Sequence, residues 1–312
     1  MKYTKLPLSF EQQAQRLLDR GLIADKKTLV EKLTVVNYYR LSAYWYNFKQ
    51  FDEITQAERF APGTSFEKIW RRYSFDRELR HLIKDALEDV EVAILRTRLV
   101  EYFTRKYGAF GYVEPANFRP EFSALDYSRS ANPRSEHSWL LHKLNEEIDR
   151  SKEHFVGLFR EKYPEEPYFP LWIAAETMAF GELFTMFRYL HYADLRYLSS
   201  LFNLYPEVMV SWLRTLLFAR NACAHHARLW NRVIPVRPYI PRIKHNPEWH
   251  SPVQFDATSI FTVLALLNYL LKYIRPQNDF RARLENLLEK YPDIPRDAMG
   301  FPSNWKDSPI WK

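Results

Sequence analysis

Hydrophobic residues recur every three or four positions along most of the chain, a spacing that predicts amphipathic α-helices. Ser9, followed by Gln12 three residues later, predicts a capping box at the start of a first helix that ends near Gly21. Asp25 predicts the start of a second helix. Helix-compatible apolar spacing then continues through an aromatic-rich segment. We therefore expect an N-terminal helical, aromatic-rich subdomain over residues 1–62.

A long amphipathic helix is predicted after Pro62 and Gly63, which interrupt the pattern and indicate a boundary. Thr64 and Glu67 form a second capping-box sequence, and the helical spacing persists until Gly108. The apolar positions of this helix fall on one stripe, made up of Leu79, Leu82, Ile83, Ala86, Val90, Ala93 and Ile94.

The second half of the chain predicts further helices separated by proline-rich segments. Residues 109–134 hold Pro115, Pro120 and Pro133 with little periodicity, which indicates a loop. Helices are then predicted over 135–163, from Pro170 through an apolar run that contains the polar Glu176, from Pro206, and over 257–274 and 278–290. We expect residues 63–290 to form the helical core and residues 291–312 to form a proline-containing tail.

Composition supports an all-α fold and restricts the setting. The chain has only 7 glycines in 312 residues and no Asn-Gly or Asp-Gly hairpin sequence. Its single cysteine, Cys223, excludes an internal disulfide and a cysteine-based zinc site. The longest apolar stretch, at 260–271, is too short to span a bilayer, and the start of the chain lacks an apolar signal region. We expect a soluble, cytoplasmic protein with no membrane contact.

The sequence ARNACAHHARLWNR, residues 219–232, carries the candidate chemistry. It follows the apolar helix that begins at Pro206, and helical spacing places Arg220 on the apolar stripe, with Asn221 and His225 on a neighbouring one. An arginine on such a stripe needs an ion pair, an interface or a pocket. An ion pair with a carboxylate such as Glu176 or Glu88 is the structural alternative. Adjacent His225 and His226 lack the spacing of a metal site, so no metal or cofactor is expected.

Positive charge is concentrated around this sequence. The chain has a formal net charge of +7, and residues 219–250 contain six Arg or Lys against one Glu. Trp230, Tyr239 and Trp249 are interleaved with these cations, a composition that suits single-stranded nucleic acid. A solvated basic loop is the alternative interpretation. For the aromatic segment near the N-terminus, base stacking and core packing both remain open, and core packing is favoured.

Five sequence blocks, in order, resemble a known family. Arg220 and His225, with Asn221 directly after the arginine, resemble the R-x4-6-H signature of HEPN domains, helical folds found in many prokaryotic ribonucleases. The blocks LPLSFEQQAQRLLDRGLI, NYYRLSAYWYNF, YSFDRELRHLIKDALEDVEVAILRT, PLWIAAETMAFGELF and RNACAHHARLWNR resemble the Abi-like abortive-infection family of bacterial phage defence, of the AbiD/AbiF type. The resemblance covers most of residues 5–275 and implies an all-α, HEPN-type helical bundle.

The resemblance implies an antiviral toxin that cleaves RNA without a metal. His225 would act as general acid or base and Arg220 would hold the phosphate. Asn221 would orient the histidine or donate to the phosphate, and His226, at a spacing that also fits, is a second proton-transfer candidate. RNA-binding candidates in the adjoining sequence are Arg228, Asn231, Arg232 and Arg237. Glu88, Glu91, Arg96 and Glu176 are candidates to support Arg220, although ordinary ion pairs explain them equally well.

A homodimer is also implied, because HEPN ribonucleases commonly pair two motifs and this chain holds one convincing copy. A regulatory RNA or an antitoxin is a further candidate partner. Two other functions fit the same sequence. One is a HEPN protein that binds a regulatory RNA without cleaving it, and the other is a helical interaction module that would associate with RNA only weakly.

Overall fold

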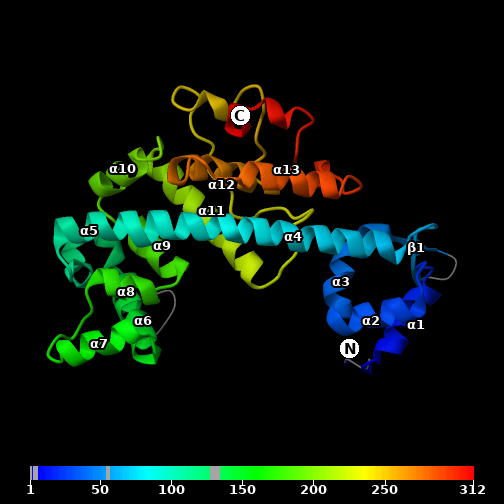
Figure 1. Ribbon diagram of the computed structural model, residues 1–312, viewed down its shortest axis with the longest axis horizontal. Helices are drawn as coiled ribbons and strands as arrows, with labels where there is room; N and C mark the ends of the chain where they lie inside the picture. The colour runs from blue at the N-terminus through cyan, green and yellow to red at the C-terminus, as the bar shows by residue number, and fades with distance from the viewer. Residues whose placement is uncertain (1, 3–5, 54–56, 127–133) are drawn as a thin grey trace.

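The computed structural model describes residues 2, 6–53, 57–126 and 134–312, most of which are helical. One continuous helix crosses most of the width of Figure 1. It consists of α4 (Phe66–Val90), a stretch of wider π-type turns (Glu91–Leu99) and α5 (Val100–Tyr107). The other helices pack along this axis and at its two ends, and the strands among the described residues form two short two-stranded sheets. The predicted all-α fold is confirmed.

The N-terminal helices begin where their caps predict. They are α1 (Phe10–Asp19), α2 (Lys26–Val35) and α3 (Tyr38–Trp45). The Ser9 capping box and the Asp25 cap are both present. The helical spacing expected throughout the aromatic-rich segment was wrong for its end, since α3 ends at Trp45 and a hairpin of β1 (Lys49–Asp52) and β2 (Ala57–Phe60) follows. Backbone bonds from Phe60 to the Arg20 carbonyl, and from Ala61 to that of Phe48, fix this hairpin through tertiary contacts that helical periodicity does not reveal.

The long helix begins one residue away from the predicted cap. Its N-cap is Ser65, whose hydroxyl accepts from the Lys68 backbone, whereas the Thr64 hydroxyl donates to the Ala61 carbonyl. The predicted end at Gly108 is confirmed, with a positive φ of 83° that suits glycine. The predicted stripe is buried except for Ala93, which is half-buried. The helix therefore presents one continuous apolar face to the core.

Each of the two long helices predicted between residues 135 and 190 is divided into two. The first consists of α6 (Glu136–Arg150) and α7 (His154–Lys162), and the second of α8 (Leu171–Thr177) and α9 (Phe180–Arg188). Between α8 and α9, Arg96 donates to the carbonyls of Ala175 and Met178. These contacts satisfy carbonyl groups that a continuous helix would have used internally, so a distant residue stabilises the interruption.

The segment predicted as a loop over 109–134 contains three 3-10 turns, Gly111–Val113, Pro115–Asn117 and Pro120–Phe122. A two-residue pairing of β3 (Leu125–Asp126) with β4 (Arg134–Ser135) closes it. Pro133 lies outside the described residues.

The remaining helices include α11, which carries the candidate motif. They are α10 (Tyr192–Ser200), α11 (Pro206–Ala224), α12 (Ile260–Ile274) and α13 (Phe280–Lys290). Pro206 occupies the first turn of α11 as predicted. Helix α11 packs against α4, α9, α10 and α12. No helix in the described ranges is long and apolar enough to cross a membrane.

The buried side chains form two hydrophobic clusters. The smaller joins α1, α2, α3 and the hairpin to the first turns of α4, through Phe66 and Ile69. The larger spans the rest of the chain and includes Phe301 and Trp311 of the predicted tail. Helix α4 thus contributes to both clusters, and the boundary placed at residue 62 stays a prediction.

Candidate active site

The last turn of α11 ends in a backbone motif that exposes both histidines. The His226 amide donates to the Cys223 carbonyl and the Ala227 amide to the Ala222 carbonyl, at 3.0 and 2.8 Å, which is the bonding pattern of a Schellman motif. His226 occupies its left-handed position, with φ 54°, where glycine is the usual residue. A side chain other than glycine is strained there. The chain therefore tolerates backbone strain at a residue of the candidate site.

The side chains of the motif are accessible to solvent. Asn221, His225 and His226 are exposed, and Arg220 is half-buried. None of the four side chains makes a hydrogen bond or an ion pair within the described chain. Cys223, between them, is buried, and burial raises its thiol pKa to about 12, so this thiol is part of the core.

The apolar stripe that helical spacing predicts for α11, made up of Met209, Leu213, Leu216, Leu217, Arg220 and Ala224, is only partly correct. Met209, Leu213 and Leu216 are fully buried, but Arg220 is only half-buried and Ala224 is exposed. The stripe leaves the core in the last turn, so Arg220 reaches solvent without the ion pair considered for it. Glu88 and Glu176 are both exposed, and neither forms an ion pair or a hydrogen bond with Arg220 within the described residues.

The other supporting residues considered for Arg220 have different partners. Arg96 pairs with Glu91 and binds carbonyls between α8 and α9. On α8 and α9, the carboxylate that is buried is Glu182 and not the predicted Glu176. Glu182 accepts from the Ala179 amide at the start of α9 and pairs with Lys143.

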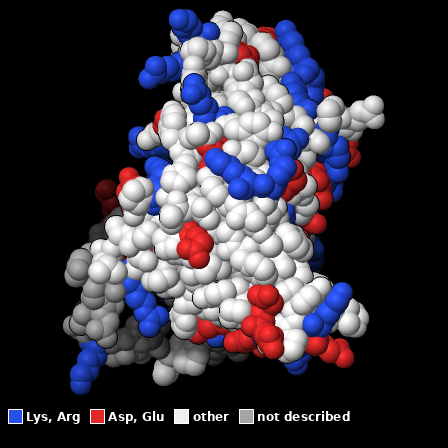
Figure 2. Space-filling model, turned by 90° about the vertical axis from the view of Figure 1, so that its left-hand side faces the viewer, with Lys and Arg blue, Asp and Glu red and all other residues white. Residues whose placement is uncertain are grey.

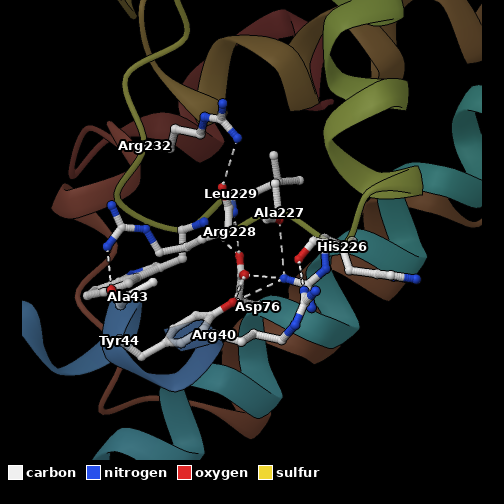
Figure 3. A network of polar contacts seen from close by, with 11 residues as sticks. Arg40, Ala43, Tyr44, Asp76, His226, Ala227, Arg228, Leu229 and Arg232 are labelled. Atoms are coloured by element: carbon white, nitrogen blue, oxygen red, sulfur yellow. Dashed lines mark hydrogen bonds and ion pairs between the residues drawn. The ribbon is translucent and has the colours of Figure 1, made fainter. Parts of the chain in front are cut away.

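A buried carboxylate holds the segment that follows the motif. Asp76 of α4 is fully buried and accepts from the backbone amides of Leu229 and Trp230 at 3.0 and 2.6 Å. It also accepts from the Tyr44 hydroxyl at 2.6 Å and pairs with Arg80, and Figure 3 shows Tyr44 and Leu229 beside it. Burial raises the pKa of Asp76, while Arg80 and the hydrogen-bond donors oppose that shift. The path of the chain directly after the histidines is therefore fixed from α4.

Two further arginines attach the motif to the N-terminal helices. Arg40 of α3 donates to the His226 carbonyl, and Arg228 donates to the Ala43 carbonyl (Figure 3). Arg80 also reaches the Ala227 carbonyl, at 3.5 Å. Arg40 and Tyr44 come from one of the sequence blocks quoted above, Asp76 and Arg80 from another, and the motif from a third. Sequence reasoning missed these positioning residues, although the blocks that contain them were the available signal.

The four RNA-binding candidates lie in different environments. Arg228 is used for the Ala43 contact, and Asn231 has a positive φ of 51°. The Arg232 guanidinium lies 5.0 Å from the centre of the Phe218 ring, and Arg237 is exposed. Their role in binding RNA stays a prediction.

The aromatic residues near the motif are mostly unavailable to a ligand. Trp230 and Trp249 are buried in the core, so the expectation that their rings could stack on a nucleic acid was wrong, while Tyr239 is 61% exposed. The N-terminal aromatic segment divides in the same way, since Tyr44 and Trp45 are buried and Tyr39 and Tyr46 are exposed.

Within the described ranges, no group of three or more His, Cys, Asp or Glu side chains is arranged to hold a metal ion. The exposed and half-buried side chains at the end of α11 carry imidazole, amide and guanidinium groups. An imidazole can accept and donate a proton, and a guanidinium can bind an anion.

Comparison with known proteins identifies one family. A family model described as Abi-like protein matches residues 31–231, more than half of the chain. The match includes α4 and all of α11, and ends within the segment that Asp76 holds. No curated protein matches the chain, and no solved structure matches it.

Proposed function

The chain belongs to the Abi-like protein family, which implies a role in abortive infection or phage defence, and we propose that it acts there as a metal-independent endoribonuclease of the HEPN type. Its active site would be the end of α11, acting on RNA in the cytoplasm. The observation that carries the proposal is the exposure of Asn221, His225 and His226 beside a half-buried Arg220, with no described partner for any of these side chains.

The proposed reaction uses the ribose 2′-hydroxyl as nucleophile. An imidazole, which we assign to His225, accepts the proton of this hydroxyl, and the 2′-oxygen forms a bond to phosphorus. The bond from phosphorus to the 5′-oxygen breaks, and the leaving oxygen takes a proton from a second acid. His226 is one candidate for this acid. Arg220 offsets the charge that grows on the phosphoryl oxygens, and Asn221 donates a hydrogen bond. The products are a 2′,3′-cyclic phosphate and a 5′-hydroxyl.

Helix geometry supports a site shared between two copies. Five residues of an α-helix correspond to about 140° of rotation, so Arg220 and His225 leave α11 in different directions. A second copy with its own α11 would supply the group that one copy directs elsewhere. We therefore assign Arg220 of one copy and His225 of the other to each site of a symmetric homodimer.

The test is cleavage of mixed RNAs by purified protein in the presence of EDTA. The variants are Arg220→Ala, His225→Ala and His226→Ala, with His81→Ala as a matched control because His81 is an exposed histidine on α4. We expect cleavage by wild type and the control and a loss of about a hundredfold or more in Arg220→Ala and His225→Ala. Intact RNA with wild type, or equal cleavage by all the variants, would overturn the proposal.

A protein that binds RNA without cleaving it is the second candidate. The divergence of Arg220 and His225 favours it if the chain acts as one copy, because no single phosphate would then face both groups. Binding alone tolerates His225→Ala. Tight, salt-dependent binding by wild type and His225→Ala, without cleavage by either, would therefore identify this function.

A further inference from the structure

A pocket of about 540 Å³ lies at the beginning of α11, away from the histidines at its end. Its wall combines the first turns of α11 with residues of α10, the segment 235–239 that follows the motif, and Arg119 from the turns after α5. Nothing in the proposed reaction uses this pocket. Because the pocket and the candidate active site lie on the same helix, one substrate could contact both.

The pocket is electropositive. Arg119, Arg214 and Arg237 line it from three separate segments, against one acidic residue, Glu207. Arg214 and Arg237 are exposed and make no ion pair within the described chain. Arg119 donates to the Arg188 carbonyl, but its Nε is buried without a partner. The surplus of guanidinium groups suits an anion such as a phosphate.

Two further features favour a phosphate at this place. Helix α11 begins at Pro206 in the pocket wall, so the positive end of the dipole of a 19-residue helix lies at this pocket. Glu207 is the acidic residue among the described residues of the pocket wall. One of its carboxylate oxygens already accepts a hydrogen bond, from the Tyr192 hydroxyl at 3.1 Å.

The same pocket presents aromatic surface. Tyr192 is 53% exposed and Tyr239 is 61% exposed, and both line the pocket. The backbone of Tyr239 is held on α11, because its amide donates to the Ser211 hydroxyl and its carbonyl accepts from Trp212 Nε1, each at 2.8 Å. An exposed ring on a fixed backbone is a platform on which a base can stack. Phosphate-binding cations and stacking rings in one pocket are the requirements of a nucleotide.

Helical spacing connects the pocket to the end of α11. Arg214, Phe218, Asn221 and His225 are separated by four, three and four residues and therefore share one face of the helix. All four side chains on this face are exposed or half-buried. The guanidinium of Arg232 lies over the ring of Phe218, which is between Arg214 and His225 on this face. From Arg214 to His225 the helix rises about 16 Å. A single strand that follows this face would thus reach both places.

Positive charge is unevenly distributed over one end of the molecule. Figure 2 shows the left-hand end of Figure 1, where α10 lies. Lys and Arg side chains are most frequent in its upper half, with some Asp and Glu among them, and Asp and Glu side chains are most frequent toward the lower edge, where some Lys and Arg also lie. Such separation directs a polyanion toward one part of this face.

We propose that the pocket of Arg119, Arg214, Arg237, Tyr192 and Tyr239 holds one nucleotide of the RNA strand whose backbone meets the motif at the end of α11. The inference rests on the proposed function, since it takes RNA as the substrate. The arginines bind the phosphate and the tyrosines stack on the base. The pocket thereby sets the register of the strand at His225.

The test measures binding of a fluorescent 2′-O-methyl RNA 12-mer, which lacks the 2′-hydroxyl nucleophile, to the full chain. Arg214→Ala and Arg237→Ala are compared with Arg16→Ala, an exposed arginine on α1 in the N-terminal part of the molecule. We expect each pocket variant to weaken binding about tenfold. Each should also reduce the slope of log affinity against log salt by about 0.7, the value for one single-strand phosphate. Arg16→Ala should leave both unchanged.

Tyrosine variants test the stacking separately. Tyr239→Ala should weaken binding about tenfold, whereas Tyr239→Phe, which keeps the ring, should bind as wild type does. Circular dichroism of each variant establishes that it is folded. If the double variant Arg214→Ala/Arg237→Ala binds the RNA as tightly as Arg16→Ala does, the inference is overturned.

Adenosine monophosphate distinguishes the two sources of a nucleotide. If it binds wild type but not the double variant, while RNA binding is unaffected by the same substitutions, the pocket serves a free nucleotide and the assignment to the RNA strand fails. Because the 12-mer resists cleavage through a 2′-hydroxyl, its binding is independent of the reaction. Loss of RNA binding in the pocket variants would support the inference even if the wild type cleaved nothing, and that outcome would count against the ribonuclease proposal alone.

Discussion

At the scale of single residues, the left-handed backbone of His226 gives the most specific expectation. Glycine would relieve the strain of a φ of 54°, whereas the neighbouring His225 has a negative φ of −83°. We expect His226→Gly to raise the free energy of unfolding by up to about 1 kcal/mol and His225→Gly to lower it by about 0.5–1 kcal/mol. Urea denaturation of both variants measures this. A destabilised His226→Gly would show that its imidazole, despite its exposure, stabilises the fold.

Asp76 provides a second expectation at this scale. Asp76→Asn leaves Arg80 buried without its carboxylate, so we expect it to lower the free energy of unfolding by about 3–5 kcal/mol. Tyr44→Phe, which removes the hydrogen bond that the hydroxyl donates to Asp76 and the one that it accepts from Arg80, should cost about 1–2 kcal/mol. Glu88→Gln, at an exposed acid on the same helix, should change stability by less than about 0.5 kcal/mol. Denaturation midpoints compare the three, and an Asp76→Asn protein as stable as Glu88→Gln would contradict the role given to this carboxylate.

These residues also show what sequence reasoning reaches. Arg220, Asn221, His225 and His226 were found because they lie within seven residues of each other at the end of a recognisable helix and include three ionisable side chains. Asp76 was not, because an aspartate on a charged amphipathic helix has the same local signature whether it faces solvent or the core. Its burial depends on Leu229 and Trp230, more than 150 positions later, whose amides it accepts.

At the scale of elements, the contact between α5 and α10 depends on one carboxylate. Asp194 of α10 is fully buried and accepts from the hydroxyls of Tyr102 and Tyr107, each at 2.6 Å, while pairing with Lys106. These donors lower the pKa of Asp194 despite its burial. Because the pKa of the folded state is lowered, the stabilisation is present above the unfolded-state pKa of about 3.9 and is lost as the pH falls through the folded-state value.

Substitution of this carboxylate therefore has a pH-dependent cost. Asp194→Asn should lower the free energy of unfolding by about 2 kcal/mol at pH 7, and the difference from wild type should shrink as the pH falls below about 4. Urea denaturation at pH 7, 5 and 3.5 follows the difference. A cost that stays constant across this range would mean that the charge of Asp194 does not stabilise the contact.

The elements that were predicted correctly have local determinants. Ser9, Asp25 and Pro206 mark helix starts through their own side chains, and Gly108 marks an end through its backbone freedom. The interruption between α8 and α9 has no such signal, because the apolar spacing continues across it. Arg96 stabilises it from another helix, and no periodicity within residues 170–190 contains that information.

At the scale of the whole molecule, the account requires two copies of α11. We expect Arg220→Ala and His225→Ala to complement each other when the two chains are exchanged by joint refolding, since each mixed dimer would keep one intact pair of groups. Random exchange should restore about one quarter of the wild-type cleavage rate. Each variant refolded alone is the control. A mixture no more active than its components would place both groups in one chain.

The measurement that most directly tests the central claim is the chemistry of the ends that the protein leaves on one defined RNA in EDTA, determined by mass spectrometry. The account predicts a 2′,3′-cyclic phosphate and a 5′-hydroxyl, produced by wild type but not by His225→Ala. It also predicts that a single 2′-deoxy nucleotide on the 5′ side of the cleaved bond stops cleavage there. Products with 3′-hydroxyl and 5′-phosphate ends, or unchanged cleavage beside the deoxy nucleotide, would contradict it.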